Sequence, residues 1–289
     1  MLLSKNAQVF YTAKDTAYLR DIGVVLLSVP HVDLSGVKDF LAGFSERTDF
    51  QEYLDDDKSG ALTNTERLLK FAGQLCYMSL GDARTKNVDA EKYFKNIKES
   101  GHGSVLEHAS FSFLVYGCPR SLTHELVRHR AGFAFSQVSQ RYVSADVLRF
   151  VERPEYQSEP ELHALFEDYI DKAAEEYTKR TDILLRNQEA GSSILSGESK
   201  RDARKKVQQC SRSCLPNETE APIVVSINVR ALRHLLEMRA ASPADIEIRH
   251  MAMHMFDIIK EYAPLLFNDY EKEISSDGFA CLKTKYRKV

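Results

Sequence analysis

The chain has 289 residues, of which 43% are hydrophobic and 28% are charged, and its formal net charge is −3. This composition is typical of globular proteins, and a chain of this length buries enough surface to fold without disulfide or metal staples. A weakly negative charge argues against recruitment to nucleic acid or an anionic membrane. There is no signal-peptide pattern, no membrane-length apolar run and no CxxC pair. We therefore expect a cytoplasmic protein with reduced thiols and no metal.

Three features stand out in the first quarter of the chain. Residues 24–29 (VVLLSV) form a β-branched run closed by Pro30, which predicts a buried strand. Residues 46–66 are polar and acidic, and we expect a loop there with its tip at residues 55–60. Residues 68–78 predict a short core helix.

The middle of the chain combines a strand with two helices. Apolar and other residues alternate over 111–115, which predicts a strand. Pro119 is expected to begin a helix that runs to about Arg130. Residues 160–190 predict a long amphipathic helix. Its expected apolar stripe comprises Leu162, Leu165, Tyr169, Ala173 and Tyr177.

The last third predicts two more helices. Residues 192–206 are polar and suggest a mobile insertion. One helix is expected over residues 228–241. The next is expected to begin with Ser242 as its N-cap and to run to about Tyr262. Because strands and helices do not alternate regularly, the sequence predicts an α+β fold with a mixed sheet packed with helices.

The most unusual segment is Thr123–Tyr142, which contains the tripeptide Arg128-His129-Arg130. On a helix these three side chains would point about 100° apart, so they could reach two ligands, or one ligand and one structural partner. The hydroxyls and amides that follow suit a nucleobase or a phosphate. The alternative interpretation is a solvated basic helix end.

Arg239 is expected on the apolar face of its own helix, where a buried guanidinium needs a partner. One interpretation is a structural ion pair with Glu247. The other is an arginine aimed at an electron-rich substrate oxygen. Asn228, Arg230 and His234 form a separate polar face on the same helix.

Two shorter motifs complete the pattern. Residues 101–108 (GHGSVLEH) do not have the HExxH spacing of a zinc site, so they predict either core histidines or a polar loop against a cofactor. Arg212 precedes a Leu-Pro-Asn turn and, taken alone, indicates a surface position. Neither a Rossmann glycine motif nor a P-loop is present.

Taken together, these segments resemble the flavin-dependent thymidylate synthases over roughly residues 65–270. The hallmark is RHR at 128–130 followed by Ser139, Arg141 and Tyr142. Residues 101–108, 124–130 and 212–217 support it, as do Asn228, Arg230, Arg239 and residues 244–248.

The resemblance implies a single-domain subunit of a homotetramer with sites at subunit contacts. Residues 61–275 would form the synthase domain, after a poorly matched segment (1–60) and before a tail (276–289). The residues implied to hold FAD are Ser104, Arg128, His129, Arg130, Gln137, Asn228, Arg230 and His234. Those implied to hold dUMP are Glu125, Leu126, Val127, Arg128, Gln137, Val138, Ser139, Gln140, Arg141, Arg212 and Arg239. Arg239 would be catalytic, by stabilising negative charge on the uracil.

The reaction implied is methylation of dUMP at C5 to give dTMP. Methylenetetrahydrofolate would supply the one-carbon unit, FAD the hydride, and NADPH the reducing power. No nucleic-acid or membrane partner is expected. The alternatives are a UMP/dUMP methylase of a specialised pathway, a flavoprotein with another substrate, and a non-catalytic nucleotide- or RNA-binding protein.

Overall fold

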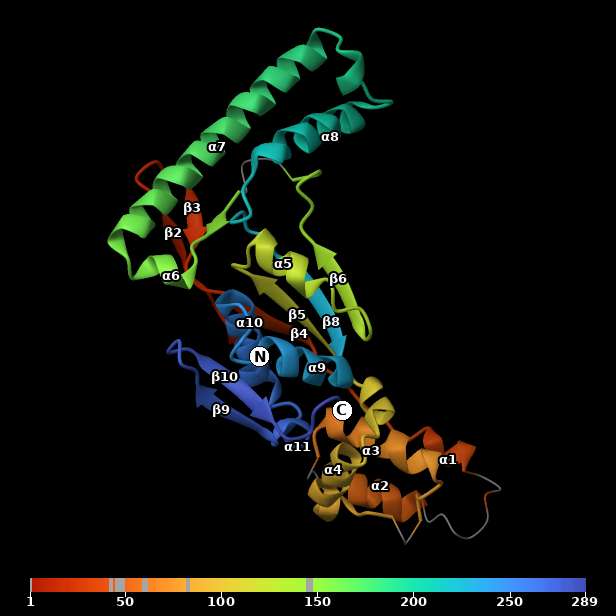
Figure 1. Ribbon diagram of the computed structural model, residues 1–289. Helices are drawn as coiled ribbons and strands as arrows, with labels where there is room; N and C mark the ends of the chain where they lie inside the picture. The colour runs from red at the N-terminus through yellow and green to blue at the C-terminus, as the bar shows by residue number, and fades with distance from the viewer. Residues whose placement is uncertain (1, 42–43, 45–49, 59–61, 82–83, 144–147) are drawn as a thin grey trace.

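An antiparallel five-stranded sheet forms the centre of the computed structural model, which describes residues 2–41, 44, 50–58, 62–81, 84–143 and 148–289 (Figure 1). In spatial order the strands are β1 (Ser4–Lys5), β4 (Gly23–Ser28), β5 (Ser110–Tyr116), β8 (Ile223–Asn228) and β6 (Phe133–Gln137). Phe111, Phe113 and Val115 are fully buried while the residues between them are half-buried, so one face of β5 meets the core. The strands predicted over residues 24–29 and 111–115 are confirmed.

Two helices, α9 (Val229–Arg239) and α10 (Ile246–Ile259), belong to the same core as the sheet (Figure 1). The helix predicted over residues 228–241 is confirmed. The start predicted for the next helix is wrong, because Asp245 and not Ser242 is the N-cap. The Asp245 carboxylate accepts from the backbone N–H of Glu247 at 3.0 Å, whereas the Ser242 hydroxyl contacts Ser275.

The C-terminal elements are anchored on α9. They are α11 (Pro264–Phe267) and the hairpin of β9 (Tyr270–Ile274) and β10 (Ala280–Thr284). The backbone N–H of Leu282 donates to the carbonyl of Ala240 at 2.8 Å. Asp269 pairs with Arg233 of α9 at 2.9 Å and with Lys98 at 3.0 Å, and all three side chains are almost completely buried. The position of α9 therefore depends on a buried ionic network.

A helical region packs at one end of the sheet (Figure 1). Its helices are α1 (Val37–Phe40), α2 (Phe50–Lys58), α3 (Asn64–Cys76) and α4 (Ala90–Glu99). The core helix predicted near residues 68–78 is confirmed as α3, which begins with a capping box between Thr63 and Glu66.

The loop predicted over residues 46–66 is wrong where α2 lies, and residues 45–49 and 59–61 fall outside the described residues. Tertiary contacts hold this acidic helix. Asp57 pairs with Arg67, Glu52 pairs with Lys86 at 2.6 Å, and Tyr53 is buried. None of these partners is near in sequence, so the local pattern did not predict the helix.

A long arm projects from the other end of the sheet (Figure 1). Its base is a three-stranded sheet of β2 (Val9–Tyr11), β3 (Ala17–Leu19) and β7 (Phe150–Val151), in which β3 and β7 are parallel. The arm itself comprises α6 (Pro154–Gln157), α7 (Pro160–Glu189) and α8 (Lys200–Ser211). Short 3₁₀ helices join elements elsewhere: η1 (Asn87–Asp89), η2 (Gly103–Glu107), η4 (Ser193–Leu195) and η5 (Arg212–Cys214).

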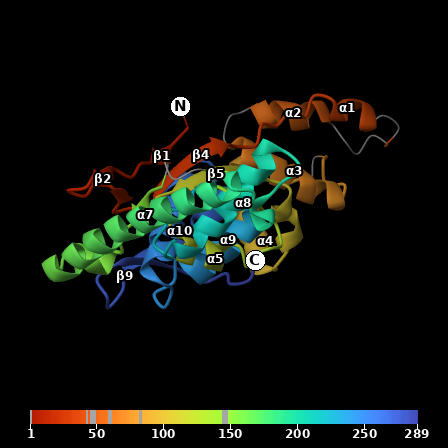
Figure 2. The same ribbon diagram turned by 90° about the horizontal axis from the view of Figure 1, so that it is seen from above.

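The arm corrects two predictions. The mobile insertion is wrong where α8 lies, because α8 packs along α7 in both views (Figures 1 and 2). Gln188 donates to the carbonyl of Ala203 at 2.8 Å, and Val207 is buried. The predicted stripe of α7 is partly wrong: Leu162, Leu165 and Tyr169 are exposed, and the face that meets the protein carries Phe166, Ile170, Ala173 and Tyr177.

The α+β prediction is confirmed, with the qualification that the main sheet is antiparallel and the small one mixed. β4 pairs with β5, so part of the N-terminal segment belongs to the central sheet. Among the described residues, no helix is both long and apolar enough to cross a membrane.

Candidate functional site

The Arg128–Arg130 tripeptide follows a helix instead of lying on one. α5 (Arg120–Leu126) has Pro119 as its N-cap and ends before the position predicted. The backbone N–H groups of Arg128 and His129 donate to carbonyls three residues back, at 3.3 and 3.1 Å, as in a tightened last turn. The three side chains are therefore not spaced by a helix. Arg128 and Arg130 are exposed, and His129 is half-buried.

Arg239, the last residue of α9, meets the segment that carries the tripeptide. Its Nε donates to Nε2 of His129 at 2.9 Å, and its Nη1 forms an ion pair with Glu125 of α5. The side chain is 20% exposed, so the guanidinium reaches solvent while its charge is compensated. The predicted partner Glu247 is wrong: Glu247 lies in the first turn of α10 and pairs with Arg153 at 3.1 Å.

His129 is held neutral by its surroundings. Burial lowers the pKa of His129 to about 4, and the positive charge of Arg239 and the neighbouring His234 act in the same direction. The ring lies 5.5 Å from that of Phe133 and 5.9 Å from that of His234. At neutral pH the imidazole is therefore an uncharged hydrogen-bonding group.

A second group gathers where β6 begins and α9 starts. Asn228 caps α9 by accepting from the N–H of Ala231 at 2.9 Å, and its own N–H donates to the carbonyl of Gly132 at 3.0 Å. Gly132 has φ of +76°, and a Cβ there would come within 2.7 Å of the Asn228 amide. Glycine at 132 thus lets the chain pass against the helix cap.

The GHGS segment joins this group through Arg230. Arg230 of α9 pairs with Glu107 of η2 at 2.5 Å. A Cβ on Gly103 would lie 2.7 Å from Nε of Arg230, so a larger residue at 103 would require this guanidinium to shift. Ser104, Arg230 and His234 are all exposed. The structure therefore brings most of the residues predicted to hold FAD to one end of β6.

The segment predicted to hold substrate follows the other end of β6. The backbone N–H of Val138 donates to the carbonyl of Pro222 at 2.9 Å, and that of Arg141 to the Ser139 hydroxyl at 3.3 Å. Nε2 of Gln140 is buried without a hydrogen-bond partner among the described residues. At about 3.3 Å per residue, the five residues of β6 span ~16 Å, and this strand separates Ser139–Arg141 from the tripeptide along the chain.

Arg212 lies in η5, directly after α8, and is half-buried. Figure 1 shows α8 in the arm and α9 beside the central sheet. The sequence reasoning missed Lys205 of α8, whose ammonium lies 5.2 Å from the ring of Tyr142, beside the Arg141 guanidinium at 5.6 Å. The basic run of α8 in the sequence is the signal that could have indicated this residue.

Two predicted substrate residues can contribute in different ways. The side chain of Leu126 is fully buried in the core, so only its backbone can meet a ligand. Val127 is 38% exposed and lies at the end of α5.

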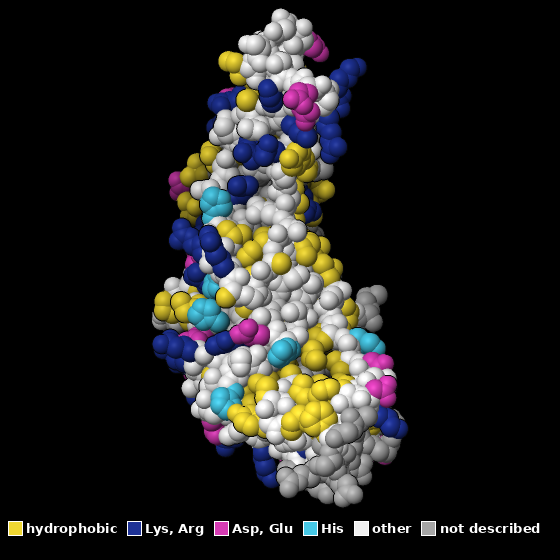
Figure 3. Space-filling view, turned by 90° about the vertical axis from the view of Figure 1, so that its right-hand side faces the viewer, with side chains coloured by type: hydrophobic (Ala, Val, Ile, Leu, Met, Phe, Trp, Pro, Cys, Tyr) yellow, Lys and Arg dark blue, Asp and Glu magenta, His cyan; other side chains and the backbone are white. Residues whose placement is uncertain are grey.

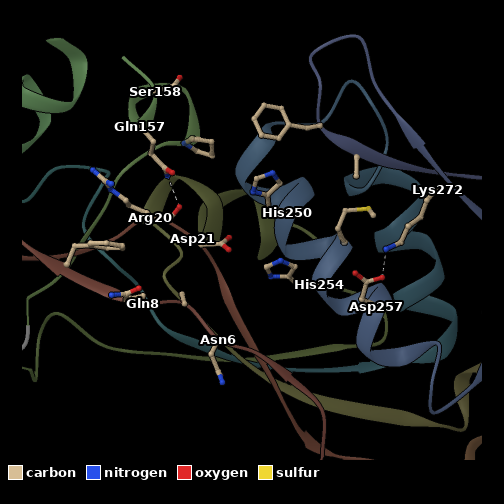
Figure 4. A pocket seen from close by; sticks show the side chains of 16 residues that line it. Asn6, Gln8, Arg20, Asp21, Gln157, Ser158, His250, His254, Asp257 and Lys272 are labelled. Atoms are coloured by element: carbon tan, nitrogen blue, oxygen red, sulfur yellow. Dashed lines mark hydrogen bonds and ion pairs between the residues drawn. The ribbon is translucent and has the colours of Figure 1, made fainter. Parts of the chain in front are cut away.

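Two cavities differ in their relation to these residues. One of 870 Å³ has Asp21, His250 and His254 in its wall (Figure 4), and no predicted site residue lines it. His254 donates through Nδ1 to the carbonyl of Ile22 at 2.9 Å, which accounts for its orientation. The other cavity, of 730 Å³, is lined by Val138 and Gln140 together with residues of α7, so it borders the predicted substrate segment.

Positive side chains mark the arm. Figure 3 faces the edge of the sheet that carries β6 and shows lysine and arginine side chains over the arm. In α8 these are Lys200, Arg201, Arg204, Lys205 and Lys206. Although the net charge of the chain is negative, the region next to Arg141 is locally positive.

Comparison with known proteins gives consistent matches. The family model described as thymidylate synthase complementing protein matches residues 60–265. The chain is 38% identical over 227 residues to a Corynebacterium diphtheriae protein named flavin-dependent thymidylate synthase, covering 78% of this chain and 87% of that protein. It is 40% identical over 237 residues to the protein of the same name from Mycobacterium avium, covering 80% and 90%.

The fold also has a solved counterpart. The crystal structure of a UMP/dUMP methylase from Streptomyces cacaoi, bound with 5-Br dUMP, matches with a TM-score of 0.57. The match covers 86% of this chain and 94% of that chain at 19% sequence identity, so it concerns the fold.

Proposed function

Because the chain belongs to the flavin-dependent thymidylate synthase family, we propose that it methylates dUMP at C5 to form dTMP. Methylenetetrahydrofolate is the one-carbon donor and NADPH the reductant. FAD, when bound, supplies the hydride. The family match at residues 60–265 contains every residue assigned below. The structural observation that carries the proposal is the contact of Arg239 with His129 and Glu125, which joins the end of α9 to the motif at residues 124–130.

The end of β6 next to α9 suits an anionic dinucleotide. Arg128, Arg130 and Arg230 are exposed cations there, and the N-terminus of the eleven-residue α9 adds a favourable dipole. Phosphates are the groups that such a set of donors prefers. To FAD we assign Ser104, Arg128, His129, Arg130, Gln137, Asn228, Arg230 and His234.

A homotetramer would complete the site. Within one chain, the tripeptide and Ser139–Arg141 lie beyond opposite ends of β6, a strand ~16 Å long, yet the assignment needs both groups at one ligand. A second subunit that presents its own end of β6 would bring them together. The exposed apolar side chains of α7, including Leu162, Leu165 and Tyr169, are suited to such a contact.

For dUMP we assign the phosphate to Arg141 and Arg212, because guanidinium groups match phosphate geometry. Arg239 donates to the uracil and stabilises negative charge on it as C5 becomes nucleophilic. Leu126 takes part through its backbone, because its side chain is buried. The remaining assigned residues are Glu125, Val127, Arg128, Gln137, Val138, Ser139 and Gln140.

The test is a visible absorption spectrum of the purified protein with FAD, before and after dUMP, followed by turnover of dUMP and UMP under the same conditions. A flavin band that shifts with dUMP, together with formation of dTMP, supports the proposal. A flavin band indifferent to dUMP contradicts it. Faster turnover of UMP would move the substrate assignment to the ribonucleotide.

A further inference from the structure

Arg239 is held from two sides by protein groups. Nε2 of His129 accepts a hydrogen bond from Nε of Arg239 at 2.9 Å, and the Glu125 carboxylate forms an ion pair with Nη1. Among the described residues, Nη2 has no hydrogen-bond partner. The guanidinium thus has one constrained side and one free edge, in a side chain that is 20% exposed.

The bond from Arg239 decides which nitrogen of His129 carries the proton. Nε2 accepts, so it is unprotonated, and the proton of the neutral ring sits on Nδ1. The groups that face the ring are Arg239 and His234 from α9 and Phe133 from β6, and Glu125 of α5 pairs with the same guanidinium. Burial and Arg239 lower the pKa of His129 to about 4, so the acceptor persists at neutral pH.

We propose that His129 is a positioning residue that fixes the plane of the Arg239 guanidinium and directs its free Nη2 edge to the substrate. This inference rests on the proposed function, in which Arg239 donates to the uracil. It goes beyond the assignment of His129 to FAD, because the acceptor nitrogen of the ring is already used by Arg239. An arginine fixed in advance stabilises developing charge without reorganisation at the moment of reaction.

Two variants of His129 test the inference in the whole chain. His129→Phe keeps a ring against Phe133 but removes the acceptor, and His129→Gln restores an acceptor without the ring. Because His129 is also assigned to FAD, the variants are assayed at saturating FAD, where we expect His129→Phe to lower kcat with dUMP by roughly 10- to 100-fold, with little change in KM for dUMP. We expect His129→Gln to recover a large part of that loss.

Arg239→Ala supplies a control that separates an action through Arg239 from a structural or flavin-binding role of His129. If His129 acts through Arg239, His129→Phe lowers kcat far less in the Arg239→Ala background than in the wild type. An equal fold-loss in both backgrounds would overturn the inference. A normal kcat in His129→Phe at saturating FAD would overturn it as well, because His129 would then act through cofactor binding alone.

A second measurement does not depend on turnover. Nitrogen NMR of histidine-labelled protein reports the tautomer of His129, whose signal is identified by its absence in His129→Gln. We expect the neutral form protonated on Nδ1 between pH 6 and 8, and a change of that signal in Arg239→Ala. A protonated ring, or a proton on Nε2, would refute the positioning role. If the protein does not turn over dUMP at all, the proposed function fails while this result still decides the geometry.

Discussion

Replacing Asp269 by Asn tests how α9, and with it Arg239, is held in place. Asp269 accepts from both Nη atoms of Arg233 at 2.9 Å and from Lys98 at 3.0 Å. The side chains of the three residues are between 1% and 3% exposed. The substitution keeps the size of the side chain but removes the counter-ion of two buried cations.

The magnitude follows from burial and from the pKa of Asp269. Burial acts to raise this pKa, but the hydrogen bonds and charge of Arg233, with Thr284 and Lys98, outweigh it and lower the pKa from 3.8 to about 2. A shift of about two units corresponds to ~2.5 kcal/mol. Leaving buried cations without a partner typically costs ~3–5 kcal/mol. We therefore expect Asp269→Asn to lower the free energy of unfolding by about 3–5 kcal/mol.

The assay is urea denaturation at one fixed protein concentration, because association with further copies would alter the apparent stability. Asp89→Asn is the matched control, since Asp89 pairs at 2.9 Å with Lys92 at the surface, where the two side chains are 47% and 84% exposed. The control should cost less than ~1 kcal/mol. Equal costs for the two variants would refute the reasoning.

The pH dependence gives the same prediction a second test. The folded pKa of Asp269 is lower than its unfolded value, so its contribution is complete above pH ~4 and is lost as the pH falls through about 2. The wild type should therefore lose stability relative to Asp269→Asn in that window.

Three further substitutions follow from the site and its surroundings. Arg239→Ala should keep the fold and FAD but lower kcat by ~10²- to 10³-fold, measured as dTMP formation; unchanged activity would remove Arg239 from the mechanism. Arg212→Ala should weaken dUMP binding by roughly 10- to 100-fold in a flavin-spectrum titration, and an unaltered affinity would contradict its phosphate role. The wild type should lose stability as the pH rises from about 4.5 to about 7, and Glu247→Gln should abolish this loss, measured as the change of Tm with pH. Burial raises the pKa of Glu247 to about 7, so the folded protein binds the proton more tightly and loses up to ~3 kcal/mol as the pH rises through that range. If Tm changed with pH in Glu247→Gln as it does in the wild type, the pH effect would come from another group.

Local patterns in the sequence were sufficient to predict the helices and strands that pack against the core. The alternation around Phe113 and the stretch from Val229 to Arg239 became β5 and α9, because burial of one face imposes a period of two or 3.6 residues on the sequence. The motifs that indicate the family are likewise short and local.

Only the tertiary structure decided which charges meet. α2 is held by Arg67 and Lys86, and Arg239 pairs with Glu125 and not Glu247. An ion pair requires two groups to be close in space, and separation along the chain does not determine that distance. The same reason explains why the predicted ligand residues fall at opposite ends of β6. Sequence order places them within one motif, whereas an extended strand ~16 Å long lies between them.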